Sequence, residues 1–198
     1  VDQRHDLRSL RIFSIDPPTA RDLDDALSIE ELPNGLFRIG VHIADVSHFV
    51  TPGTPLDKEA AVRSTSVYLV DRVIPMLPRL LCEELCSLNP GVDRLAFSII
   101  WEMNSSGEIQ STWAGKSIIC SCGKLSYPQV QELIDGTATP QGPPATGVQL
   151  HGTAHSWADV ASDALKLHRV ASEMRRKRFE VDGALRLDNV RLYFELDD

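Results

Sequence analysis

The sequence is poor in cysteine, in basic charge and in long apolar runs, and each shortage excludes a class of protein. Four cysteines among 198 residues are too few for a disulfide scaffold, which indicates a reduced, intracellular protein. No apolar run approaches the ~20 residues that a membrane-spanning helix needs. The charged opening VDQRHDLRSL is not typical of a signal peptide. We therefore expect a cytoplasmic, globular domain without membrane association.

The shortage of basic residues bears on possible partners. Lysine and arginine number 20 against 28 aspartates and glutamates, a formal net charge of −8. Non-specific phosphate binding needs a basic surface, so this balance by itself stands against a nucleic-acid partner. The count overstates the acidic surface if several carboxylates hold cations. The distribution of the acidic residues therefore matters more than their sum.

What the sequence does contain is an interspersed series of strand-like and helix-like segments without internal repeats. One hairpin is indicated by the Asn34-Gly35 dipeptide, and another turn spans residues 104–107. Expected strands cover residues 11–15, 25–32, 36–46, 94–103 and 108–120, with two short strands in 184–198. Expected helices cover residues 54–65, 79–86, 126–136 and 156–178. This pattern predicts an α+β fold in which helices pack on an antiparallel-rich sheet.

Residues 137–152, TATPQGPPATGVQLHG, are rich in proline, glycine and threonine. Such a composition is typical of a mobile surface loop rather than of a packed element. We interpret it as a loop inside one domain that extends over residues 1–198.

The stretch SIDPPTARDLDDALSI, residues 14–29, gathers four aspartates within ten positions: Asp16, Asp22, Asp24 and Asp25. On an extended segment Asp22 and Asp24 share a face, whereas Asp25 points the other way unless the chain turns. Pro17 and Pro18 allow the chain to fold back toward them. Carboxylate oxygens on a short loop suit a hard cation such as Mg²⁺ or Mn²⁺. Two such ions stabilise the attacking and leaving oxygens of phosphoryl transfer.

Other interpretations of this cluster stay open from spacing alone. Most aspartate-rich turns are solvated loops, but apolar residues interleave these acids and favour partial burial, where unneutralised like charges are costly. An EF-hand fits poorly because the glycine and the closing glutamate of that loop are missing. An aspartate-based phosphatase also uses an Asp-x-Asp pair. It needs that pair directly after a buried strand, and here PTAR precedes Asp22.

Several long motifs together resemble one known family. DPPTARDLDDALSI, GVHIADVSHFV, the stretch from STSVYLV to FSIIWEM, KLSYPQVQELI and GALRLD are similar, in this order, to segments of the ribonuclease II (RNB) exoribonucleases, and most of all to their eukaryotic branch. The resemblance covers essentially the whole chain. It implies Mg²⁺-dependent, processive hydrolysis of single-stranded RNA from its 3′ end to nucleoside 5′-monophosphates, in RNA decay.

The same resemblance implies roles for particular residues. Asp16, Asp22, Asp24 and Asp25 correspond to the four catalytic, metal-holding aspartates of the family. Tyr68 and Tyr127 lie where the family places tyrosines that stack on bases of the RNA. Stacking is suited to an enzyme that accepts any sequence, because every base has a π-face. No small-molecule cofactor is implied, and the full-length form is expected to be a monomer.

The chain departs from the family in extent. Members carry cold-shock-type domains before this region, and after it a further helical part and an S1-type domain; none of these is found in the 198 residues. The chain thus resembles the N-terminal part of the catalytic domain. An inactive fragment that only binds RNA or a partner is the alternative function, and the aspartate-based phosphatase is a further one. The exosome-associated relatives also allow a nuclear location.

The remaining candidates have ordinary structural interpretations beside functional ones. Arg21 either pairs with a carboxylate or steers an RNA phosphate. His42 is expected to be a core histidine rather than a ligand, and Asp45 either orients the aspartate loop or ends a strand in solvent. The cysteine spacings, 82 with 86 and 120 with 122, fit buried apolar positions rather than zinc ligands. The basic run 175–178 is a solvated helix end or a phosphate contact.

Overall fold

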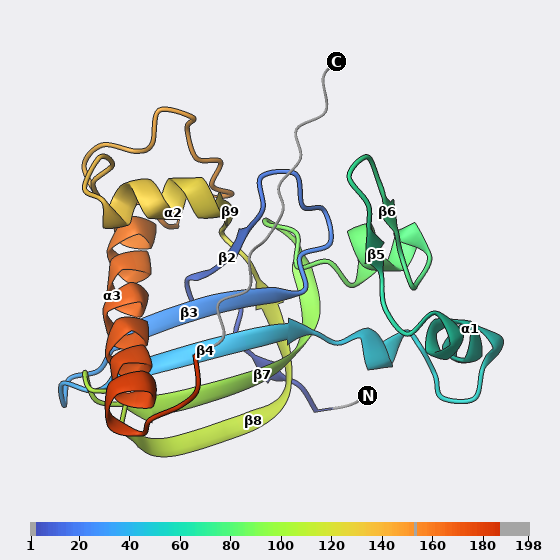
Figure 1. Ribbon diagram of the computed structural model, residues 1–198, viewed down its shortest axis with the longest axis horizontal. Coiled ribbons are helices and arrows are strands. Elements are labelled where there is room, and N and C mark those ends of the chain that lie inside the picture. The colour runs from blue at the N-terminus through green and yellow to red at the C-terminus, as the bar shows by residue number, and fades with distance from the viewer. Residues whose placement is uncertain (1–2, 153, 187–198) are drawn as a thin grey trace.

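The structure is a computed structural model that describes residues 3–152 and 154–186. One seven-stranded sheet organises these residues, in the order β1-β8-β7-β4-β3-β2-β9 (Figure 1). Its strands are β1 (His5–Asp6), β2 (Ile12–Asp16), β3 (Asp25–Glu31), β4 (Phe37–Ala44), β7 (Asp93–Met103), β8 (Ile109–Cys120) and β9 (Gly123–Ser126). All neighbours are antiparallel except the pairs β1–β8 and β2–β9. The expected α+β, antiparallel-rich fold is confirmed.

The hairpins form where turn residues predicted them. β3 and β4 pair from Asp25 opposite Ile43 to Glu31 opposite Phe37, and Gly35 between them has a φ of 79°. A positive φ at this turn is sterically open to glycine and strained for most other residues. The longest strands, β7 and β8, pair over eleven partners around the turn at residues 104–107.

Three helices begin at capping residues that stand first in the expected helical ranges. Thr54 accepts a hydrogen bond from Asp57 N at the start of α1 (Pro55–Arg63). Ser126 and Ser156 form capping boxes at α2 (Tyr127–Ile134) and α3 (Trp157–Arg176), so orphan backbone donors of the first turn are satisfied. Residues 79–86 are helical as expected, but η2 (Leu80–Leu85) is a π-helix. A second π-helical turn, η3 (Lys177–Val181), continues α3.

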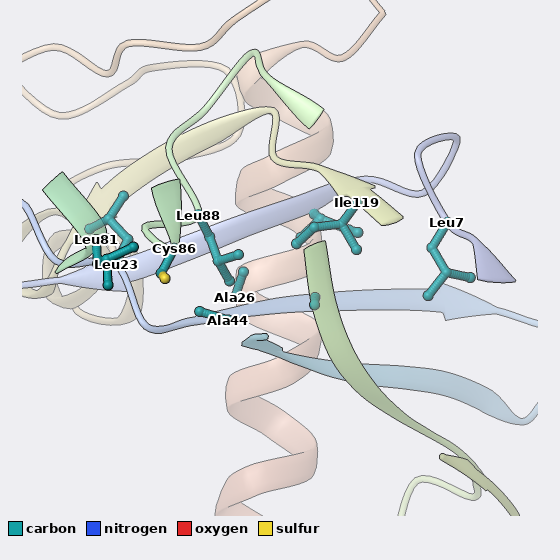
Figure 2. Close-up of a cluster of buried hydrophobic side chains, with 10 residues drawn as sticks. Leu7, Leu23, Ala26, Ala44, Leu81, Cys86, Leu88 and Ile119 are labelled. Atoms are coloured by element: carbon teal, nitrogen blue, oxygen red, sulfur yellow. The ribbon is translucent and has the colours of Figure 1, made fainter. Parts of the chain in front are cut away.

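The sheet is covered differently on its two faces. α2 and α3 pack on one face, where Val160 of α3 joins Phe13 and Leu125 of the strands in one apolar cluster. On the opposite face a cluster that includes Ile12, Ala96 and Ile119 fills the core. Figure 2 shows Leu23, Leu81, Cys86 and Leu88 gathered at one end of this second cluster, with Leu7 at the other. No helix of the described residues is long and apolar enough to cross a membrane.

Residues 45–92 form an excursion between β4 and β7, at the end of the sheet away from α3 (Figure 1). It contains the 3₁₀ helix η1 (Val46–His48), α1, the two-stranded hairpin of β5 (Val67–Tyr68) and β6 (Val73–Ile74), and η2. Much apolar surface remains exposed here, at Val67, Leu69, Val70, Ile74 and Leu80. The excursion therefore packs less completely than the sheet.

Two expectations about the chain after α2 have different outcomes. Residues 137–152 contain no helix or named strand, but Leu150 bridges to Gly123 and Thr139 bridges to Gly142. Their mobility stays a prediction. The two strands expected in 184–198 fall mostly on residues 187–198, which lie outside the described part of the chain. Residues 184–186 are not in a strand.

Candidate active site

The four aspartates lie at the junction between two neighbouring strands of the sheet. Asp16 is the last residue of β2, and Asp25 is the first residue of β3. Asp22 and Asp24 lie in the loop that connects them. β2 and β3 are antiparallel neighbours, so the end of β2 and the start of β3 lie at the same end of the sheet. The carboxylates influence one another electrostatically, as the sequence predicted for a folded-back segment.

Leu23 anchors this loop to the core from between the aspartates. Its side chain is 1% exposed and packs in the cluster with Leu81 and Leu88 (Figure 2). Leu23 N donates to Ser87 Oγ at 3.0 Å, and Leu88 N donates to Leu23 O at 2.9 Å. The Ser87 hydroxyl in turn donates to Arg21 O at 2.8 Å. The buried Leu23 thus anchors the loop, and the charged aspartates on either side of it are held in fixed positions.

Lys124 fastens the other part of the loop. Its ammonium donates to the carbonyl oxygens of Pro18 and Ala20, at 3.2 and 2.5 Å. Lys124 lies on β9, which runs parallel to β2 and pairs Lys124 with Ser14. The backbone beside the aspartates is thus fixed by a charged donor from a strand about a hundred residues away, which lies close only because β9 pairs with β2.

Asp16 is the most buried of the four carboxylates. Only 8% of the residue is exposed, and Oδ2 has no hydrogen-bond partner among the described residues. Desolvation raises the pKa of Asp16, and the charges of Asp25 and Asp22 raise it further. The Ser14 hydroxyl and the Lys124 ammonium oppose this rise, although Ser14 Oγ lies outside hydrogen-bonding geometry. The site therefore holds a buried oxygen acceptor without a donor.

Asp22 and Asp24 share a different environment. Both line a hollow of about 320 Å³, together with Tyr68, Cys82 and apolar side chains of the excursion. Desolvation raises the pKa of Asp24, and the charges of Asp22, Asp25 and Asp16 add to the rise. Asp24 O also accepts from Ala44 N at 2.9 Å, which ties this aspartate to the end of β4. Asp22 and Asp24 were expected to share a face of the chain, and both side chains do line the same hollow.

The chemistry of this donor set fits a hard divalent cation. Four carboxylates at one strand junction repel one another, and Oδ2 of Asp16 has no donor in the described part of the chain. Carboxylate oxygens are the ligands that Mg²⁺ and Mn²⁺ accept. Within the described residues, however, no three His, Cys, Asp or Glu side chains are arranged to hold a metal ion. Binding would thus require movements of these side chains.

The two predicted stacking tyrosines are both exposed, and they belong to α2 and β5, which lie on either side of the loop between β2 and β3 (Figure 1). Tyr127 is 59% exposed as the first residue of α2, directly after the cap Ser126. Tyr68 is 66% exposed on β5. Its hydroxyl donates to Asp22 Oδ2 at 2.9 Å, and this bond is the largest cause that raises the pKa of Tyr68 to about 12. Both tyrosines are exposed. Among the described residues, only Tyr68 makes a hydrogen bond to one of the four aspartates.

The other candidates have structural partners. Arg21 points to solvent with its side chain 78% exposed, and its nearest carboxylate is Glu83, at 3.8 Å. Asp45 is 4% exposed and pairs with Arg4 at 2.6 Å, so the alternative of a strand end in solvent is wrong. Its side-chain hydrogen bonds among the described residues go to Arg4 and Ser47, not to the aspartate loop. The Arg4 and Ser47 hydrogen bonds hold the pKa of Asp45 below its usual value despite burial. Of the two roles expected for Arg21, the structure shows the pairing with a carboxylate, that of Glu83.

His42 is a core histidine, as expected. It is fully buried, and its ring nitrogens lie 3.0 Å from Ser28 Oγ and 2.7 Å from Ser98 Oγ. Ser98 Oγ continues the chain to Ser117 Oγ at 2.6 Å. Burial lowers the pKa of His42 to about 4, so the ring is neutral at pH 7. This buried polar ladder joins the neighbouring strands β3, β4, β7 and β8.

The cysteines and the basic run also follow their structural interpretations. All four cysteines are free, and Cys86 and Cys122 are buried. Arg176 pairs with Glu173 at 3.1 Å, while Arg175 and Arg178 lie over the Phe179 ring. A phosphate contact by this run stays a prediction.

Sequence reasoning missed the residues that hold the cluster rather than the cluster itself. Ser87, Lys124 and the Tyr68 hydroxyl contact the loop from 46 to 106 positions away along the chain. No spacing rule connects such positions. The sequence signal was the placement of these residues inside the family motifs: Tyr68 and Ser87 in the stretch from STSVYLV to FSIIWEM, and Lys124 in KLSYPQ.

Comparison with known proteins agrees with this geometry. The RNB domain family model matches residues 4–198. DIS3-like exonuclease 2 of Xenopus tropicalis is 53% identical over 98% of this chain and 23% of its own length. The protein of Arabidopsis thaliana named inactive exonuclease DIS3L2 is 52% identical over 100% of this chain and 18% of its own length. The chain thus spans about a fifth of these relatives.

Solved structures share the fold as well. Mycoplasma genitalium RNase R in complex with ribose-methylated single-stranded RNA superimposes with a TM-score of 0.77 at 26% sequence identity, over 91% of this chain and 26% of that chain. The eukaryotic relatives and the matched domain model confirm the resemblance of the motifs. On these grounds the chain belongs to the RNB domain family.

Proposed function

We propose that this chain is the N-terminal part of the catalytic domain of a 3′→5′ exoribonuclease. Single-stranded RNA with a free 3′ end is the substrate, and processive hydrolysis releases nucleoside 5′-monophosphates. The observation that carries the proposal is the four-aspartate junction of β2 and β3, with a buried oxygen of Asp16 that lacks a donor. Relatives named as exonucleases and an RNase R structure with single-stranded RNA support it.

Asp16, Asp22, Asp24 and Asp25 are the residues proposed to hold Mg²⁺, with Mn²⁺ as a substitute. A bound ion there would supply charge neutralisation at the phosphate and an activated water. The chain's own contribution is to hold the carboxylates on an anchored loop and to keep Asp16 away from water. Tyr68 and Tyr127 offer exposed rings to the terminal bases. The Arg21 side chain is 78% exposed and only 3.8 Å from Glu83, and we propose that it exchanges this pairing for an RNA phosphate.

Partners and location follow from the same proposal. We expect a monomeric full-length enzyme that needs no small-molecule cofactor and takes part in RNA decay. Four free cysteines suit the reducing cytoplasm, and a nuclear location is the alternative.

The decisive experiment compares RNA cleavage by Asp25→Asn and by the parent, both in a chain extended to the length of the relatives. We expect Asp25→Asn to abolish hydrolysis of a 3′-overhang RNA and to keep single-strand binding. Asp135→Asn, the same change at an exposed position next to the end of α2, is the matched control and should cleave normally. Parallel loss of binding and cleavage in Asp25→Asn would instead give this residue a structural role.

A second candidate function is RNA or partner binding without cleavage. The observation in its favour is that a relative with 52% identity is named inactive. Digestion of the same RNA by the 198-residue chain with Mg²⁺ separates the two functions. A Mg²⁺-dependent rise in thermal stability, reduced in Asp24→Asn, would support a cation site in this chain. An aspartate-based phosphatase is disfavoured by family membership.

A further inference from the structure

The Tyr68 hydroxyl is hydrogen-bonded to Asp22, whereas the described residues show no such bond for the Tyr127 hydroxyl. The phenol oxygen lies 2.9 Å from Asp22 Oδ2, while the ring remains 66% exposed. Forty-six residues separate the two partners in sequence. A base that stacks on the ring uses its π-face, so the hydroxyl is available for a separate task.

The backbone around Tyr68 is held from both directions. Leu69 N donates to Arg72 O at 2.9 Å across the hairpin, and Met76 N donates to Ser66 Oγ at 3.1 Å. Arg63 at the end of α1 donates to Pro75 O at 3.1 Å. The hairpin thus offers the phenol to Asp22 from a supported position. A tyrosine also has few rotatable bonds, so little side-chain entropy is lost when its hydroxyl is engaged.

The bond is placed where it can act on the carboxylate but adds little to the fold. Tyr68 is largely solvent-exposed and its neighbour Val67 is 45% exposed. A hydrogen bond in such a setting exchanges with water and contributes little net stability. At the same time, it occupies one oxygen of Asp22 in the hollow that Asp22 and Asp24 share. The remaining oxygen, Oδ1, is not engaged by this bond.

We propose that Tyr68 is a positioning residue whose hydroxyl orients the Asp22 carboxylate for a divalent cation. This inference rests on the proposed function, in which Asp22 holds Mg²⁺. Hydrogen bonds to the free oxygen of a ligating carboxylate fix its orientation, and loss of such a bond typically weakens metal binding about 10–100-fold. The ring and the hydroxyl of one tyrosine then have separate roles, toward RNA and toward Asp22.

Isothermal titration calorimetry of the 198-residue chain with MgCl₂ tests this directly. Four proteins form a double-mutant cycle: the parent, Tyr68→Phe, Asp22→Asn and the double variant. We expect Tyr68→Phe to raise the Kd for Mg²⁺ about tenfold. The double variant should match Asp22→Asn, because the hydroxyl acts only through that carboxylate. Tyr127→Phe removes the same atom from the other tyrosine and should leave the Kd unchanged.

The outcomes separate this inference from the proposed function. If the parent binds Mg²⁺ and Tyr68→Phe binds it equally or more tightly, the positioning role is wrong while the metal site stands. If the parent binds no Mg²⁺, both are wrong for this chain. A melting temperature of metal-free Tyr68→Phe well below that of the parent would make the bond structural and overturn the inference. Matching melting curves with a raised Kd support it.

Discussion

The two sides of the aspartate loop are built differently. On one side Asp16 pairs with Ser126 across β2 and β9, and Ser126 caps α2, where Tyr127 begins the helix. On the other side Asp22 is held by Tyr68, from a hairpin of two-residue strands. The first side is rigid because sheet pairing, a capping box and a buried core act together. The second relies on a side-chain hydrogen bond between partly exposed groups.

This difference shows how one loop combines rigidity with adjustment. Asp16 cannot move without disturbing the sheet, so it is suited to define the position of a cation. Asp22 lies next to the anchored Leu23, so adjustment is left to its carboxylate, which Tyr68 holds from a hairpin whose apolar residues are largely exposed. A site whose carboxylates must move to bind a cation can make such movements on the hairpin side at low cost in stability.

The largest effect that would sharpen the comparison is on core stability. Leu125 is fully buried beneath α2 and next to Ser126, whereas Leu80 of η2 is 63% exposed. Leu125→Ala should lower the free energy of unfolding by about 2–5 kcal/mol. Leu80→Ala should change it by no more than about 0.5 kcal/mol. Urea titration followed by circular dichroism measures both, and equal losses would remove the distinction between the two sides.

The next effect concerns the exposed ring on the rigid side. In a chain of the relatives' length, Tyr127→Ala should weaken the hold on one base by about 1–3 kcal/mol, with slower cleavage or a longer final product. Its melting temperature should barely change because the ring is 59% exposed. Tyr127→Phe should be nearly silent, in contrast to Tyr68→Phe. Denaturing gels of RNA digests provide the measurement, and equal damage by Phe and Ala would rule out stacking.

A smaller effect tests the capping box itself. Ser126→Ala removes an acceptor for Gln129 N and should lower stability by about 1 kcal/mol. Thr54→Ala removes the equivalent acceptor from α1, which buries only Ala60 among its described residues. Fraying of α1 leaves the core intact, so its melting temperature should fall less. A larger drop for Thr54→Ala would show that the excursion supports the sheet more than its packing indicates.

The smallest expected effect is a change in pH dependence. The folded pKa of Asp16 is raised above its ordinary 3.8, so the folded state binds this proton more tightly than the unfolded state. Stability of the metal-free chain should therefore fall as pH rises from about 3.8 through the folded pKa. Asp16→Asn should be more stable than the parent at pH 7 and converge with it in acid. Thermal melts of both proteins from pH 3.5 to 7.5 provide the measurement. If their melting temperatures differ by the same amount at every pH, the predicted role of Asp16 is wrong.

Local sequence signals were sufficient for most elements. Asn34-Gly35, Thr54-Pro55, Ser126 and Ser156 each specify a turn or a cap by contacts within a few residues, and such contacts are visible as short-range patterns. The short strands β1, β5, β6 and β9 were missed. They contain two to four residues, and their pairing partners are distant in sequence except within the hairpin of β5 and β6.

The sequence alone determined the identities of the four aspartates and the family to which they belong, because both are contained in contiguous motifs. Tertiary structure alone decided which groups hold the loop: Ser87 beneath Leu23, Lys124 beside Pro18, and Tyr68 against Asp22. It also buried Asp16 and left its Oδ2 without a donor. Desolvation and hydrogen bonds between distant segments depend on strand order and burial, and neither quantity is encoded at any single position of the chain.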